Sequence, residues 1–362
     1  MILEELSSVV QVLVFPGVLF ILAYSLFCNW VSRKWIARLQ NRQGPLHTGW
    51  QGILQPLADV IKLLAKEDIT PGGATKLVFS ATPLLIFAIP LAALFLIPIQ
   101  SITNLWSYAP IASFEGDLIF VLFLLSIVIL AIFLAGWSSA NAFGAVGATR
   151  VAFMMLSYEI PLALAAIGPA IMAQSLRILN IVNWEAGSWN RFLAAPSVLG
   201  IALGGVMLIG FAIYTICLLA ELEMRPFDMS EAETEIVHGW QVEFSGKKLA
   251  LLTLGHDVKI VLASALLTSL YLGGASGPWP IPPIVWFVLK TVFCVLILSN
   301  LSALFARFRI DQLLKGAWKY LVPLSVLQVM AVVALTGLMR HGDGERAAEQ
   351  RDEEALHPDL PL

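Results

Sequence analysis

The residues best suited to chemistry gather in one stretch, ELEMRPFDMSEAETEIVHGWQVEFSG, residues 221–246, with seven carboxylates and a single arginine, Arg225. Carboxylates that crowd together beside apolar helices repel one another, so the pKa of some of them rises. Coupled carboxylates of this kind can exchange protons near neutral pH, which predicts a proton-handling site. A solvated acidic loop that docks a basic partner is the alternative that composition leaves open. The carboxylates are Glu221, Glu223, Asp228, Glu231, Glu233, Glu235 and Glu243.

Ionisable residues inside apolar segments are the second chemical signal. Glu159 lies in MMLSYEIPLAL, and His256, Asp257 and Lys259 lie together in LTLGHDVKIVL. A charge at the centre of a bilayer costs at least about 2.5–3.5 kcal/mol, so such residues normally face a bundle interior or a water-filled cavity and mark ion paths. For Asp257 and Lys259, an ion pair between the two is an equally acceptable interpretation.

The composition requires a membrane protein. Hydrophobic residues make up 58% of the 362 residues, charged residues only 13%, and the mean hydropathy is +0.82. Soluble domains carry roughly 25% charged residues, so this chain cannot cover a water-soluble surface. The formal net charge of −3 predicts no attraction to nucleic acid.

Eight segments are long and apolar enough to cross a bilayer core of about 30 Å as helices. Helices satisfy their own backbone polar groups in lipid, so the predicted fold is an all-α integral membrane protein with about eight spans. We treat 1–339 as a single transmembrane domain and expect 340–362, which is charged and lacks an apolar face, to be disordered. The predicted spans are 9–31, 78–100, 118–137, 149–173, 197–220, 249–273, 282–306 and 321–338.

Loop charge predicts the orientation. The connections after the first, third, fifth and seventh spans carry fifteen lysines and arginines, whereas the opposite side has five. The positive-inside rule then places those four connections in the cytoplasm and both termini on the other face.

The first of these connections also contains an amphipathic segment. Between Trp50 and Ala65, apolar residues recur at spacings of three, four and seven, which is typical of a helix with one apolar face. We expect a helix at the cytoplasmic membrane interface. Packing against the bundle is an alternative, and the two are compatible.

The chain shows no sign of a catalytic centre of its own. It has no nucleophile elbow, P-loop, dinucleotide fingerprint or HExxH motif. Its cysteines, Cys28, Cys217 and Cys294, stand singly in apolar segments, which predicts neither a metal site nor a disulfide. The residues alone therefore leave a proton-handling membrane subunit, a channel or transporter, and a structural scaffold as candidates.

Several long motifs in order resemble a known family, the membrane-embedded H subunit of proton-pumping respiratory complex I (NADH-quinone oxidoreductase). The resemblance runs from Arg33 to Pro323. The motifs are NRQGP (41–45), GILQPLADVIKLLAKEDITP (52–71), AGWSSANAFGAVGATR (135–150), SYE (157–159), PFDMSEAETEIVHGWQVEFSG (226–246) and RFRIDQLL (307–314).

The resemblance implies a role at the quinone site without redox chemistry in this chain alone. It implies a prokaryotic inner (plasma) membrane location, no cofactor bound by the chain itself, and quinone as substrate at an interface with peripheral subunits that carry the terminal iron–sulfur cluster. Other membrane-arm subunits and lipid are the remaining implied partners. The implied quinone-chamber residues are Arg33, Arg42, Asp59, Lys62, Lys66, Glu67, Asp68, Arg225 and Asp228. The implied proton-coupling residues are Glu159, Glu221, Glu231, Glu233, Glu235, His256 and Asp257.

Four departures from the family pattern lie near the implied quinone pocket. Ser32-Arg33 stands where the family has Glu-Arg, and Met224 replaces an arginine, with Arg225 one position further on. Asn300-x-Ser302 replaces Trp-x-Arg, and His256-Asp257 replaces Glu-Tyr. They favour, as the alternative, the homologous membrane subunit of an energy-converting hydrogenase or formate hydrogenlyase. A stand-alone transporter is a further alternative, although no inverted repeat supports it.

Overall fold

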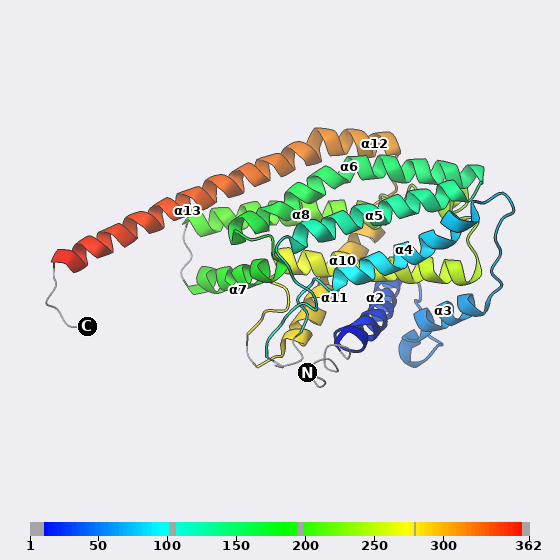
Figure 1. Ribbon diagram of the computed structural model, residues 1–362, viewed down its shortest axis with the longest axis horizontal. Coiled ribbons are helices and arrows are strands. Elements are labelled where there is room, and N and C mark those ends of the chain that lie inside the picture. Colours follow the sequence, from blue (N-terminus) through cyan, green and yellow to red (C-terminus); the bar gives the residue numbers. More distant parts are fainter. Residues whose placement is uncertain (1–10, 101–105, 195–197, 279, 357–362) are drawn as a thin grey trace.

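The computed structural model describes residues 11–100, 106–194, 198–278 and 280–356, apart from the side chains of 189–194 and 340–356. All secondary structure in these ranges is helical (Figure 1). Eight helical segments are long and apolar enough to cross a membrane, which confirms the predicted fold class and number of spans.

The spans follow the predicted order with shifted ends. They are α2 (Val18–Leu39), α4 (Lys76–Leu94), α5 (Asp117–Ser138), α6 (Ala142–Ala173), α8 (Val198–Glu221), α10 (Gly246–Tyr271), α11 (Pro283–Leu304) and a last span formed by α12 (Ile310–Gly316), a π-helical turn (Ala317–Leu321) and α13 (Val322–Leu356).

Helix α10 lies at the centre of the bundle. It contacts α2, α3, α4, α6, α7, α8 and α11, and from Asp257 to Tyr271 every one of its residues is buried. Because lipid tails are as apolar as the side chains, such packing depends on close contact and polar bonds between helices more than on the hydrophobic effect. Polar groups on α10 are therefore placed where several helices can reach them.

Two of the differences from the predicted ends concern charged segments. The first span continues to Leu39, so Arg33, Lys34 and Arg38 lie on its last turns and not in a loop. The chain is helical to Leu356, where we expected disorder from residue 340. The physical reason is composition, since the Ala, Glu, Arg and Gln residues of this tail are strong helix formers.

Two shorter helices lie outside the spans. The amphipathic segment forms α3 (Gln55–Ala65), preceded by a 3₁₀ turn (Trp50–Gly52), and it packs on both α2 and α10. Helix α7 (Ile178–Ala194) was not predicted. Ile178, Ile181 and Val182 are fully buried at helical spacing, and this spacing is the signal in the sequence that indicates the helix.

Candidate functional site

The acidic stretch 221–246 follows α8 and covers the ends of α5 and α6 (Figure 1). It contains two short turns of helix, α9 (Glu233–Ile236) and a 3₁₀ turn (Gly239–Gln241). The close packing of the stretch against α5 and α6 depends on glycine. A Cβ on Gly147 of α6 would lie 2.5 Å from the backbone nitrogen of Trp240, and one on Gly136 of α5 would lie 2.9 Å from the Trp240 Cβ. Only residues without a side chain permit this approach.

Lys259 is the cation at the centre of the site. Its ammonium lies 3.1 Å from the Glu221 carboxylate and donates to the Glu221 carbonyl at 2.5 Å. The exposed fractions of the two side chains are only 4% and 2%, so water does not screen the pair. The buried Tyr158 hydroxyl of α6 also hydrogen bonds to the Glu221 carboxylate. Sequence reasoning singled out Lys259 but did not assign it to the proton-coupling group.

Two further carboxylates share this cation. Glu223 accepts hydrogen bonds from the Ser230 hydroxyl and, at 3.2 Å, from the Trp240 indole, and Glu231 accepts one from the Gln241 amide. Burial raises the pKa of Glu223, and Lys259 opposes that rise. Burial, followed by repulsion from Glu223 and Asp228, raises the pKa of Glu231 well above its ordinary value. The predicted cluster of carboxylates with raised pKa therefore has a physical basis in the structure.

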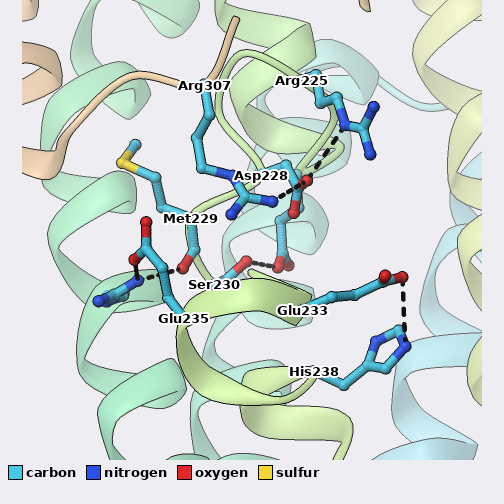
Figure 2. A network of polar contacts seen from close by, with 10 residues as sticks. Arg225, Asp228, Met229, Ser230, Glu233, Glu235, His238 and Arg307 are labelled. Atoms are coloured by element: carbon cyan, nitrogen blue, oxygen red, sulfur yellow. Dashed lines mark hydrogen bonds and ion pairs between the residues drawn. The ribbon is translucent and has the colours of Figure 1, made fainter.

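Asp228 lies between two arginines, as Figure 2 shows. Arg307, which precedes α12, donates to its carboxylate at 2.7 Å, and Arg225 lies 3.6 Å away. The structure thus brings together Arg225 and Asp228, both predicted for the quinone chamber. Arg225, one position later than the family arginine, remains 58% exposed and still reaches this carboxylate.

Of the remaining carboxylates, Glu235 binds α6 and Glu243 accepts a hydrogen bond from Asn141 at the start of α6, whereas the partner of Glu233 lies within the stretch itself. Arg150 of α6 donates to Glu235 at 2.8 Å and to the Met229 carbonyl at 3.1 Å, and its hydrogen bond lowers the pKa of Glu235 (Figure 2). Glu233 is exposed and lies 3.5 Å from His238. These two predicted coupling residues lie at the surface of the site, in contrast to Glu221 and Glu231.

Glu159 connects to the same centre through its sequence neighbour. Its carboxylate accepts a hydrogen bond from the Ser126 hydroxyl of α5, and the preceding residue, Tyr158, contacts Glu221. Glu159 is half-buried. Glu159 therefore lies next in sequence to the tyrosine that binds Glu221.

Asp257 belongs to a different part of the bundle. It accepts a hydrogen bond of 2.5 Å from Asn29 of α2, whereas Lys259 binds Glu221. The suggested ion pair between Asp257 and Lys259 is therefore wrong, because residues two apart on a helix point about 200° away from each other. His256 is half-buried on α10.

The predicted entrance residues lie around α3. Arg33 of α2 forms an ion pair of 2.7 Å with Asp59 of α3. Asp68 lies 3.3 Å from Lys248, whose ammonium also donates to Thr70, so the segment after α3 is bound to the start of α10. Arg42, Lys62, Lys66 and Glu67 are exposed and join neither pair.

A groove of about 390 Å³ lies beside α2, on the side that faces the 3₁₀ turn before α3. Its lining includes Trp30, Lys34 and Trp50, and Lys34 lies over the Trp30 ring and donates to the Gln51 side chain at 2.7 Å. Next to it, the Trp35 indole donates to Asn300 at 3.0 Å, so one residue that departs from the family pattern has a defined partner.

The fold and site define a multi-span helical membrane protein whose buried carboxylates lie at one end of the bundle. A family profile described as NADH dehydrogenase matches residues 10–333. The chain is 35% identical to the second NADH-quinone oxidoreductase H subunit of Rhizobium meliloti (strain 1021), an alignment that covers 90% of this chain and 98% of that protein. It is 36% identical to the NADH-quinone oxidoreductase H subunit of Thermomicrobium roseum, with 87% and 91% covered.

The chain belongs to the NADH dehydrogenase family, and its resemblance to the H subunit of complex I is confirmed. A third relative, the second NADH-quinone oxidoreductase H subunit of Syntrophobacter fumaroxidans, is 33% identical over 87% of this chain and 92% of its own length. These names do not favour the hydrogenase alternative.

Proposed function

We propose that this chain is the membrane subunit of a proton-translocating NADH-quinone oxidoreductase that forms the membrane side of the quinone chamber. It would carry out no redox step alone, and partner subunits would supply the iron–sulfur clusters. Its own task would be to convert quinone reduction into proton movement. Support comes from the buried Glu221–Lys259 pair with the half-buried Glu223 and Glu231 beside it, and from the hydrogen bond between Glu221 and Tyr158, the residue next to Glu159.

Charge balance explains why this arrangement suits the task. Glu221, Glu223 and Glu231 lie near a single buried ammonium, so full ionisation would leave uncompensated negative charge at low dielectric. Reduction of a quinone to a quinol takes up two electrons and two protons. Negative charge that arrives beside the stretch raises the pKa of its carboxylates and draws protons to them. Because such coupling is reciprocal, protonation of the stretch in turn favours the reduced quinone.

The groups around α3 would guide the quinone. The groove beside α2 offers indole faces and a lysine, and the Arg33–Asp59 pair joins the first span to α3. An amphipathic helix at the membrane interface would allow an apolar quinone to enter from the lipid. By the positive-inside rule this end of the bundle faces the cytoplasm, and both termini lie on the other side.

Glu159→Gln in the intact complex, reconstituted into proteoliposomes, tests this function. We expect electron transfer from NADH to quinone to persist, while the number of protons translocated per electron falls. The control is Glu115→Gln, because Glu115 is an exposed carboxylate that lies outside the acidic stretch. An unchanged proton-to-electron ratio in the Glu159 variant would refute the relay.

A further inference from the structure

A second set of buried polar side chains lies in the half of the bundle away from the acidic stretch. It comprises Glu185 of α7, Tyr214 of α8, Tyr271 of α10 and Gln328 of α13. Their exposed fractions run from 0% to 6%. Four different helices thus each contribute a polar group to an apolar interior. Burial of a polar group without a hydrogen bond costs free energy, so a compensating partner is expected.

Three of these groups meet at one helix crossing. The Tyr214 and Tyr271 rings lie 5.9 Å apart. A Cβ on Gly210 would lie 2.9 Å from both the Tyr271 hydroxyl and the Gln328 amide nitrogen, so the glycine makes room for the two polar groups. A Cβ on Gly168 of α6 would lie 2.4 Å from the same amide.

Glu185 lies where this set reaches the far end of the bundle. Its Cβ is 3.7 Å from the position that a Cβ on Gly273 would take, in the turn that follows α10. Lys290 of α11 fixes this turn by donating to the carbonyls of Leu272, Gly274 and Ser276 at 2.6, 3.1 and 2.7 Å. Burial raises the pKa of Glu185 to about 8, so the carboxyl can hold or release a proton near neutral pH.

The other end of the set reaches the candidate site. Tyr214 precedes Glu221 by seven residues on α8, which places both on the same side of the helix about 10.5 Å apart along its axis. In Figure 1, α7 and the turn after α10 lie at the opposite end of the bundle from the acidic stretch. Tyr214 and Glu221 thus lie on one side of α8, about two turns apart, and Tyr214 is the nearer of the two to the end that bears α7.

The set has more polar atoms than protein partners. Within the described part of the chain, both amide atoms of Gln328, the Tyr214 hydroxyl and one carboxyl oxygen of Glu185 have no hydrogen-bond partner. The Tyr271 hydroxyl donates to the Ala165 carbonyl at 2.8 Å and can still accept a bond. Buried polar atoms are normally satisfied, and those without a protein partner bind ordered water.

We propose that a chain of water molecules runs along Tyr214, Tyr271 and Gln328 and carries protons between Glu221 and Glu185, so that this subunit contains a proton path of its own across the bundle. Each transfer passes one proton to the next water and receives one from behind, so no charge accumulates along the chain. Glu185 accepts the proton at one end and releases it toward the face that bears α7. The inference rests on the proposed function only in taking Glu221 as the source of the protons.

The first test is a map of the intact complex, by electron cryomicroscopy at a resolution that shows water. We expect ordered water within hydrogen-bond distance of the Gln328 amide, the Tyr214 hydroxyl and the Glu185 carboxyl. This result does not depend on activity. A dry interior, with these side chains bonded to one another or to protein, would overturn the proposal.

The second test measures protons translocated per electron in proteoliposomes for Gln328→Leu and Glu185→Gln. We expect a lower ratio with electron transfer retained. The exposed Glu115→Gln is the matched control for the carboxyl, and Gln328→Met, which also removes the amide but differs in shape from leucine, separates loss of the polar group from a change of packing. A purely structural glutamine predicts the reverse, because an apolar side chain in place of an unsatisfied amide leaves assembly intact and the ratio unchanged.

The variants also separate this inference from the proposed function. If Glu159→Gln lowers the ratio and both new variants leave it unchanged, the path through Glu185 is wrong and the relay stands. If Glu159→Gln leaves the ratio unchanged while Glu185→Gln lowers it, the relay is wrong and the path stands. Should either new variant fail to assemble, the water positions in the wild-type map decide the question.

Discussion

Replacement of Lys259 by Met is the most informative perturbation of the candidate site. The substitution keeps the length of the side chain and removes its charge. It leaves Glu221 buried without its cation, and it takes a donor from the Glu221 carbonyl at the end of α8. We expect the chain to be strongly destabilised and the acidic stretch to loosen.

The size of the destabilisation by Lys259→Met follows from the burial of the Lys259–Glu221 pair. With 4% and 2% of the two side chains exposed, this pair belongs to the class in which loss of one partner costs about 3–5 kcal/mol. Neutralising both members removes the uncompensated charge, so Lys259→Met combined with Glu221→Gln should recover most of that loss. The coupling between the two substitutions is therefore expected to be large and favourable.

Unfolding of the purified chain in mixed detergent micelles, followed by loss of helical circular dichroism, gives the four free energies of unfolding. The single Lys259 variant should lose the most stability. If the double variant loses the sum of the two single effects, the residues do not interact and the central role of Lys259 is wrong. Assembly of the complex provides a second readout of the same order of stabilities.

Two further predictions concern the acidic stretch. Gly147→Ala should displace the stretch, because the new methyl would lie 2.5 Å from the Trp240 nitrogen. We expect the free energy of unfolding to fall by about 1–3 kcal/mol and the complex to assemble poorly. Gly204→Ala is the control and should change neither, because no atom lies within 4 Å of the new methyl. The raised pKa of Glu231 stabilises the folded stretch below its unfolded value of about 4.5, and that stability is lost as pH rises toward the folded value. Protection of 221–246 against hydrogen exchange, measured relative to the base-catalysed intrinsic rate, should therefore fall as the pH rises above the unfolded value of about 4.5. Glu231→Gln should remove that dependence and Glu233→Gln should keep it, and the opposite pattern would contradict the assignment.

The spans could be predicted because length and hydropathy act locally along the chain. A run of about 20 apolar residues needs no knowledge of its neighbours to be recognised. The ends were less certain because charged residues can continue a helix beyond the lipid, as Arg33 and Arg38 do on α2. Helix α7 escaped detection because it is short and contains polar residues such as Asn180 and Glu185.

The pairing of charges could not be predicted because it joins residues far apart in sequence. Lys259 lies 38 residues from Glu221, and Asp257, only two positions away, turns instead to Asn29, which lies 228 residues from it. The carboxylates of the acidic stretch could be recognised as a group by their density. Which of them are buried, such as Glu221, half-buried, such as Glu231, or exposed, such as Glu233, depends on how the stretch packs on α6.

The link between the segment after α3 and the start of α10 also has a consequence for the order of events during synthesis. Ile69 and Thr70 bind Ser245 and Lys248, residues that emerge from the ribosome 176 and 178 positions later. At a synthesis rate of 5–20 residues per second, the first cytoplasmic connection waits roughly 10–35 s for its partners. During that interval α3 has an apolar face and no docking site on α10. Until α10 emerges, the apolar face of α3 can pack only on α2 and on the membrane interface, so the surface around α3 is completed only after about two-thirds of the chain has been made.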